Sequence, residues 1–144
     1  MSPVRRIRPN YRSVTGRVGL GEGRPPGEFE STLERDFLLL LSFDPAADEI
    51  EPPPFRVAWV DEEGKKRRAY PDVRFRLRPL TYADCRRAPF LRSETNVVCQ
   101  IKYRAELHRR WKELRPGLIA CRDACRDTGW VFRVFTDRHI RTPF

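Results

Sequence analysis

The stretch of residues 29–45 (FESTLERDFLLLLSFDP) restricts the fold more than any other part of the chain. Ser31 and, three residues later, Glu34 form a helix start signal of the capping-box type. Four leucines follow at residues 38–41, and the helical pattern stops at Asp44, which precedes a proline. The sequence therefore predicts a helix that begins near Ser31 and ends near Asp44.

Glu34 lies on the face of this helix that should point into the protein. At about 100° per residue, the residues three, four and seven positions after it share its face. They are Phe37, Leu38 and Leu41. A buried carboxylate is costly unless it is paired or holds a metal ion. Two interpretations stay open: Glu34 only closes the capping box at a wet helix end, or it belongs to an interior site.

The composition is that of a folded, basic chain. With 144 residues, 40% hydrophobic and 34% charged, the chain is predicted to be one globular domain. It has neither an apolar run long enough to span a membrane nor a signal-peptide core, so we expect a cytoplasmic protein with no membrane partner. The net charge of +9 favours a polyanionic partner, although a merely soluble basic protein would have the same charge.

Positive charge is concentrated in two regions. Residues 1–28 are predicted to be a basic arm followed by a Gly/Pro loop, and the arm carries Arg5, Arg6, Arg8, Arg12 and Arg17. A charged helix further on carries Arg104, Arg109, Arg110, Lys112 and Arg115. Both regions are predicted to contact a nucleic-acid backbone; the alternatives are a solvated tail and an ordinary solvated helix face.

Alternating apolar residues predict several strands. Residues 55–60 (FRVAWV) and 65–70 are expected to pair as a hairpin through the turn at 61–64. Further strands are predicted over residues 73–77, with arginines on one face, over residues 96–103, and over residues 130–136. Compared with the strand over residues 73–77, the strand over residues 96–103 is more apolar and should be more central.

The remaining segments complete an α/β pattern. Residues 44–51 are predicted to be an acidic turn, and helices are predicted over residues 105–114 and 118–128. Pro116 should break the chain between these helices, and Gly129 should end the second. The order of elements predicts a single domain with a mixed central sheet flanked by helices.

The four cysteines do not form a recognisable metal motif. They are Cys85, Cys99, Cys121 and Cys125, with no C-x-x-C pair among them. A structural zinc site is a weak alternative here, because the histidines also lack zinc-finger spacing. We expect reduced thiols in the core.

Four polar residues are placed as in a sheet-based nuclease: Glu34, Asp72, Gln100 and Lys102. Asp72 follows Pro71 at the entrance of a predicted strand. Gln100 and Lys102 are two apart on another strand, so they project from the same face. In such sites carboxylates hold Mg²⁺, the metal polarises the phosphate and its bound water, and a lysine orients that water or neutralises charge.

The spacing of these residues resembles a known signature. Pro71-Asp72…Gln100-Ile101-Lys102 is similar to the PD…(D/E)xK pattern of restriction-endonuclease-like nucleases, with a glutamine in place of the second acid. Among these nucleases the chain resembles the TnsA family, the endonuclease subunits of heteromeric transposases. The site of that family has the pattern Glu…Asp…Gln-x-Lys.

Other stretches carry the same resemblance. The helix sequence of residues 30–45, the run YPDV at residues 70–73 and the ending WVFRVFTDRHIR of residues 130–141 are all similar to motifs of the TnsA nuclease domain. The resemblance spans roughly residues 15–141, which is nearly the whole chain. It implies a restriction-endonuclease-like fold over residues 29–144.

The resemblance also implies an activity and partners. TnsA-type subunits cut double-stranded DNA at the 5′ ends of a transposon, while an integrase-type transposase (TnsB-like) processes the 3′ ends and an AAA+ regulator (TnsC-like) activates the pair. Glu34, Asp72 and Gln100 would be ligands of Mg²⁺, for which Mn²⁺ would substitute, and the carbonyl of Ile101 would add another. Lys102 would position the attacking water. The implied location is the cytoplasm of a prokaryote, in association with the nucleoid.

Two other functions stay open. One is a catalytically silent module that docks DNA and a transposase, and Asp72 and Lys102 argue against it. The other is a stand-alone restriction or repair nuclease, and Gln100 argues against it. Many TnsA proteins carry a C-terminal helical domain that contacts the AAA+ regulator, and we expect none here. We also expect Asp72→Ala to abolish cleavage without lowering the melting temperature, because it relieves repulsion with Glu34.

Overall fold

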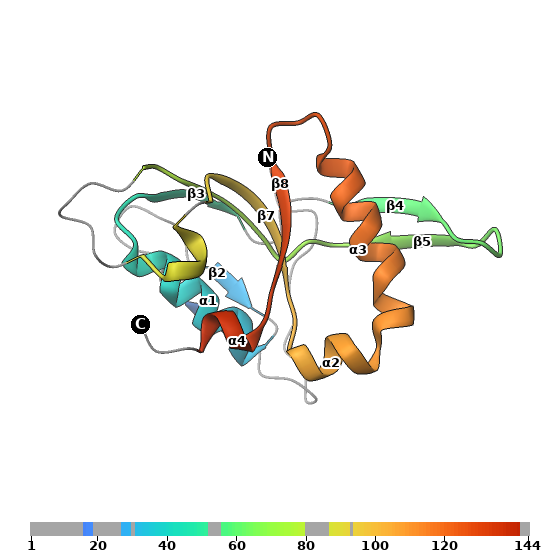
Figure 1. Cartoon of the computed structure of the whole chain (residues 1–144), viewed down its shortest axis with the longest axis horizontal. Helices are drawn as coiled ribbons and strands as arrows, with labels where there is room; N and C mark the ends of the chain where they lie inside the picture. Colours follow the sequence, from blue (N-terminus) through green and yellow to red (C-terminus); the bar gives the residue numbers. More distant parts are fainter. Residues whose placement is uncertain are drawn as a thin grey trace.

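A mixed four-stranded sheet forms the centre of the protein (Figure 1). The computed structural model describes residues 16–18, 27–29, 31–51, 56–79, 87–92 and 94–141. The strands lie in the order β3-β6-β7-β8, with β7 and β8 parallel and the other neighbours antiparallel. Their bounds are β3 Ala47–Glu51, β6 Val73–Leu77, β7 Asn96–Ile101 and β8 Val131–Phe135. The strand predicted to be central, β7, has a neighbour on both sides.

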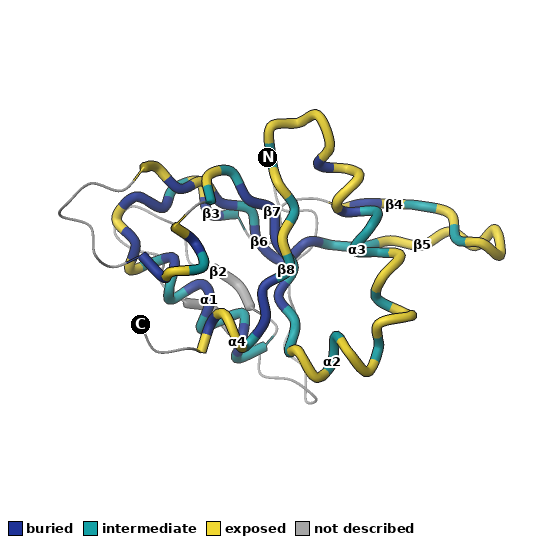
Figure 2. The backbone as a smooth tube through the Cα atoms, viewed as in Figure 1, coloured by how far each residue is buried: buried dark blue, intermediate teal, exposed yellow. Residues whose placement is uncertain are grey.

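Helix α1 (Thr32–Phe43) packs on one face of this sheet. The hydroxyl of Ser31 accepts the Glu34 N–H at 3.1 Å, and Asp44 is the C-cap, so both predicted ends are confirmed. The stripe predicted to point inward is fully buried, and it meets alternate residues of β6 and β7 in the main core. Figure 2 shows this part of the backbone as largely buried. The core side chains from the two strands are Val73, Phe75, Leu77, Val97, Cys99 and Ile101.

Helix α3 (Trp111–Cys125) lies beyond the other face and follows the short helix α2 (Arg104–Arg109). Its partners are β8 and a separate hairpin, β4 (Val57–Val60) and β5 (Lys66–Ala69). Figure 1 shows this hairpin extending away from the central sheet beside α3. Gly64 closes the hairpin turn with φ +77°, a backbone conformation that favours glycine, and so the predicted hairpin is confirmed.

The predicted helix break at Pro116 is wrong. Helix α3 runs through Pro116 and Gly117, and the chain instead breaks at Arg110, between α2 and α3. Proline removes one N–H that would have bonded the carbonyl of Lys112; Lys112 is exposed, so water can satisfy that carbonyl. Gly129 has the left-handed φ expected of it (+83°), but the C-cap is Arg126, a little earlier than predicted.

The predicted acidic turn at residues 44–51 is also wrong over most of its length, because it contains strand β3. The acids of β3 pair with arginines of β6: Glu51 contacts Arg74 at 2.6 Å, and Asp48 contacts Arg76 at 3.1 Å. Opposite charges across neighbouring strands stabilise a sheet. The cationic face predicted for β6 therefore exists, but it is neutralised within the protein.

Three shorter elements complete the described part. The strands β1 (Gly16–Val18) and β2 (Gly27–Phe29) pair antiparallel within the region predicted to be an arm and loop. A 3-10 turn, η1, covers Pro89–Leu91, and the helix α4 (Asp137–Ile140) follows β8. None of the helices in the described segments is both long enough and apolar enough to cross a membrane. The whole is a small α/β domain with a mixed sheet and flanking helices, as predicted.

Candidate active site

The four residues singled out from the sequence line one cavity. Glu34, Asp72, Gln100 and Lys102 all face a hollow of about 280 Å³ at the end of β7, where β6 begins. They come from three separate parts of the chain: the first turn of α1, the entrance of β6, and β7 with the residue that follows it. The other lining residues are Trp59, Arg68, Ala69, Tyr70, Glu113, Leu114, Gly117 and Leu118.

Asp72 is held tightly against β7. Its backbone N–H donates to the carbonyl of Cys99 at 2.9 Å, and its Oδ2 accepts the N–H of Ile101 at 2.6 Å. The residue is only 9% exposed. A carboxylate that accepts a backbone N–H is fixed in direction, so the strand pairing itself sets where Asp72 stands in the cavity.

Glu34 lies at the capped start of α1 and also lines the cavity. Its backbone N–H is capped by Ser31, while its side chain lines the cavity together with Asp72. Burial raises the pKa of the Cys99 thiol well above its ordinary value, and the negative charges of Asp72 and Glu34 raise it further. Both carboxylates therefore act on the same buried thiol beneath the cavity.

The far end of β7 supplies Gln100 and Lys102. Gln100 is paired in register with Val134 of β8, and the Lys102 N–H donates to the carbonyl of Phe135 at 3.1 Å. Both side chains are half-buried, and neither has a hydrogen bond or ion pair with a residue in the described part of the chain. The cavity thus offers an amide and an ammonium group without such partners next to two carboxylates.

One further contact fixes α1 relative to β7. The hydroxyls of Thr32 and Tyr103 lie 3.0 Å apart and join the first turn of α1 to the segment just after Lys102. The guanidinium of Arg141 stands over the Tyr103 ring at 5.4 Å and bonds the Thr32 hydroxyl at 3.1 Å. These contacts hold Glu34 close to the end of β7, since Glu34 is only two residues from Thr32.

The donor atoms suit a hard cation such as Mg²⁺. Glu34 and Asp72 supply carboxylate oxygens and Gln100 an amide oxygen, the ligand types that Mg²⁺ prefers. Within the described segments, no group of three or more histidine, cysteine or acidic side chains is arranged to hold a metal. A site here would therefore depend on the two carboxylates with amide, carbonyl and water oxygens.

Sequence reasoning missed several lining residues. Glu113 brings a third carboxylate to the wall, and Arg68 brings a second cation. Glu113 lies in the first turn of α3 and is bound to Arg110 at 3.1 Å, so its charge is partly compensated. Nothing in the sequence distinguishes these two residues from the many other charged ones; only the packing of α3 on the hairpin brings them here.

The predicted DNA-contacting residues lie in different environments. Arg104, Arg109 and Lys112 are exposed on α2 and the start of α3. Arg110 is half-buried and ion-paired with Glu106 at 2.9 Å, so it is less available to a ligand. The structure gives only the backbone of Arg17, in β1, and the other predicted arm residues lie outside the described residues: Arg5, Arg6, Arg8 and Arg12.

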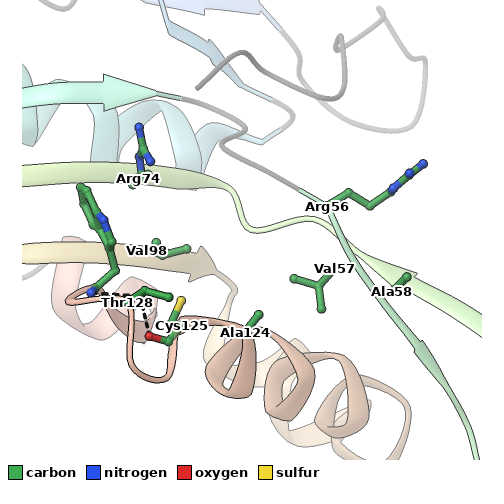
Figure 3. A pocket seen from close by; sticks show the side chains of 9 residues that line it. Arg56, Val57, Ala58, Arg74, Val98, Ala124, Cys125 and Thr128 are labelled. Carbon is green, nitrogen blue, oxygen red and sulfur yellow. Dashed lines mark hydrogen bonds between the residues drawn. The ribbon is translucent and has the colours of Figure 1, made fainter.

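A larger hollow of about 570 Å³ lies between α3, β4 and the sheet (Figure 3). Two arginines line it: Arg56 is exposed, and Arg74 is paired with Glu51 and lies over Trp130 at 4.8 Å from the ring centroid. No carboxylate is among the side chains that line it. This hollow therefore lacks the donors of a cation site, and the acidic cavity is the better candidate for chemistry.

Comparisons with known proteins leave the family open. No protein-family model matches the chain, and no curated protein matches it either. The cavity and the resemblance in sequence are therefore the two observations that bear on function.

Proposed function

We propose that the protein is a metal-dependent DNA endonuclease of the restriction-endonuclease-like type. The observation that supports this most is the presence of Glu34, Asp72, Gln100 and Lys102 in one cavity. These residues lie up to 68 positions apart in the sequence, between Glu34 and Lys102, so only the fold brings them together. The mixed sheet with α1 on one face is compatible with the fold this proposal requires.

In this proposal Glu34 and Asp72 would hold Mg²⁺, with Gln100 and the Ile101 carbonyl as the remaining protein ligands. Bound Mg²⁺ supplies charge stabilisation to the phosphate and acidifies a water molecule. The hydrogen bond from Ile101 keeps Asp72 aimed at the cavity. Lys102, with no ion-pair partner in the described segments, holds the attacking water or offsets the charge that develops on the phosphate.

The biological setting follows from the sequence resemblance. We propose that the chain acts in the prokaryotic cytoplasm as the TnsA-like subunit of a heteromeric transposase and cuts the 5′ ends of the element. Its partners would be a TnsB-like transposase and a TnsC-like AAA+ regulator. The net charge of +9 agrees with a DNA substrate.

A docking module without catalysis is the main competing function. It would use the same fold and charge but would not need two carboxylates, an amide and a lysine around one cavity. The presence of all four favours catalysis, because a purely structural wall has no use for a half-buried lysine without an ion-pair partner in the described segments.

Cleavage in a reconstituted transposition reaction tests the proposal. Wild-type protein, transposase and regulator should cut the 5′ ends of the element only when Mg²⁺ or Mn²⁺ is present. Asp72→Asn should remove 5′ cleavage and leave 3′ processing by the transposase intact. Cleavage by Asp72→Asn at the wild-type rate would exclude this cavity as the nuclease site and leave the docking function in its place.

A further inference from the structure

The hairpin β4–β5 has two different faces. Directly paired residues of antiparallel strands point to the same side, so Trp59 and Arg67 share one face and Val60 and Lys66 share the other. The first face packs on α3, where the Trp59 ring lies against Gly117. The second face carries four side chains, all of which are exposed: Ala58, Val60, Lys66 and Arg68.

The cations on this outer face have no partners among the described residues. The side chains of Lys66 and Arg68 make no hydrogen bond or ion pair with any described residue. Their neighbour on the inner face differs, because Arg67 is bonded to Asp61 at 2.9 Å and so stabilises the hairpin turn. Arg76, elsewhere on the surface, is likewise paired with an acid. Unlike these two paired arginines, Lys66 and Arg68 have no acid in the described segments to offset their charge.

The hairpin leads straight into the candidate active site. Strand β5 ends at Ala69, and three residues later Asp72 stands in the acidic cavity. Arg68 itself lines that cavity, and Lys66 lies two residues further out on the same face of the hairpin. Two cations without a partner in the described segments thus follow each other along the hairpin, starting with Arg68 at the cavity. Figure 1 shows that this hairpin extends away from the central sheet.

We infer that the outer face of β4–β5 binds the phosphate backbone of duplex DNA beside the phosphodiester that is cut. This inference rests on the proposed function, since it names the surface that would guide DNA into that cavity. The small side chains of Ala58 and Val60 let the backbone approach the strands closely. The acids of the turn, Glu62 and Glu63, stand at the tip, so the contact runs along the side of the hairpin.

Binding of a labelled DNA duplex in EDTA, across a salt series, tests the inference without cleavage. The test variant is Lys66→Gln with Arg68→Gln. The matched control is Arg122→Gln with Arg126→Gln, which removes the same charge from exposed residues of α3 and its C-cap. Each phosphate contact adds about 0.9 to the slope of log affinity against log salt, so the test variant should be shallower by about 1.8 and the control unchanged.

A variant that keeps the charge, Lys66→Arg with Arg68→Lys, should restore most of the wild-type slope and so separates charge from folding. Equal slopes for the test variant, the control and the wild type would overturn the inference, and so would an absence of wild-type binding at low salt. The result is independent of cleavage. If DNA binding depends on Lys66 and Arg68 but the wild-type protein cuts no DNA, the inferred binding surface would be supported and the proposed nuclease function would be refuted.

Discussion

Substitutions of Asp72 should separate its structural role from its catalytic one. The Oδ2 atom of Asp72 accepts the Ile101 N–H at 2.6 Å in a position that is only 9% exposed. Asp72→Ala removes that acceptor and leaves a buried N–H without a partner. Asp72→Asn removes the charge but keeps an amide oxygen of the same shape in the same place, so the hydrogen bond can survive.

The size of the difference follows from the cost of an unsatisfied buried N–H, about 1–3 kcal/mol. For a chain of this length, each kcal/mol shifts the melting temperature by about 2–4 °C. Asp72→Ala should therefore melt a few degrees below Asp72→Asn. From the sequence alone, Asp72→Ala is expected to melt no lower than wild type, because the substitution relieves repulsion with Glu34. The structure adds the loss of the hydrogen bond to Ile101, which opposes that relief, so the expected melting temperature is lower.

Thermal melts in EDTA and chemical denaturation measure this difference directly, and the reconstituted cleavage reaction measures activity in parallel. Both variants should lose cleavage, and Asp72→Ala should be less stable than Asp72→Asn. Equal melting temperatures for the two variants would refute the claim that the Ile101 hydrogen bond holds this carboxylate.

Two further predictions concern ion pairs and pH. The side chain of Asp44 is only 1% exposed and is paired with Arg87 at 2.5 Å. Arg87→Ala leaves this buried carboxylate without its partner and should destabilise the fold by about 3–5 kcal/mol in urea denaturation. A loss below about 1 kcal/mol would contradict this. The Arg104 N–H donates to Asp137 at 2.7 Å and holds the pKa of that carboxyl below its usual 3.8. The stability that Asp137 contributes is complete above that value and is lost as the pH falls through the lowered pKa. Asp137→Asn should therefore flatten the acid limb of the stability curve, and an unchanged acid limb would contradict this.

Much of the fold follows from local sequence signals. The start of α1 is set by Ser31 and its buried stripe by helical periodicity, and both depend only on neighbouring residues. The same holds for the alternation in β6 and for the hairpin turn, where Gly64 adopts a conformation that few other residues tolerate. These elements need no knowledge of distant contacts, and the sequence predicts them nearly to the residue.

The errors come from tertiary contacts that override local preference. The acids before Glu51 look like a turn by composition, yet they form β3 because Arg74 and Arg76 stand opposite on β6 and neutralise them. Pro116 looks like a helix break, yet it is accommodated because its turn faces water and the preceding break at Arg110 already redirects the chain. A single sequence gives no pairing partners, so neither outcome follows from it.

The residues of the candidate site likewise fall into two groups, those that the sequence predicts and those that depend on tertiary contacts. Its four central residues follow from the resemblance and from spacing, since Gln100 and Lys102 must share a face of one strand. Arg68 and Glu113 reach the wall of the cavity because α3 packs against the hairpin, and no local sequence pattern predicts that packing.

A titration with Mn²⁺, followed as the rise in melting temperature, tests the central claim most directly. The claim is that Glu34 and Asp72 together bind a divalent cation in this cavity. Wild type and Lys102→Ala should both be stabilised as Mn²⁺ increases, because the ammonium is not a ligand, while Glu34→Gln and Asp72→Asn should gain little. Equal stabilisation of all four proteins by Mn²⁺, or none in the wild type, would contradict the account.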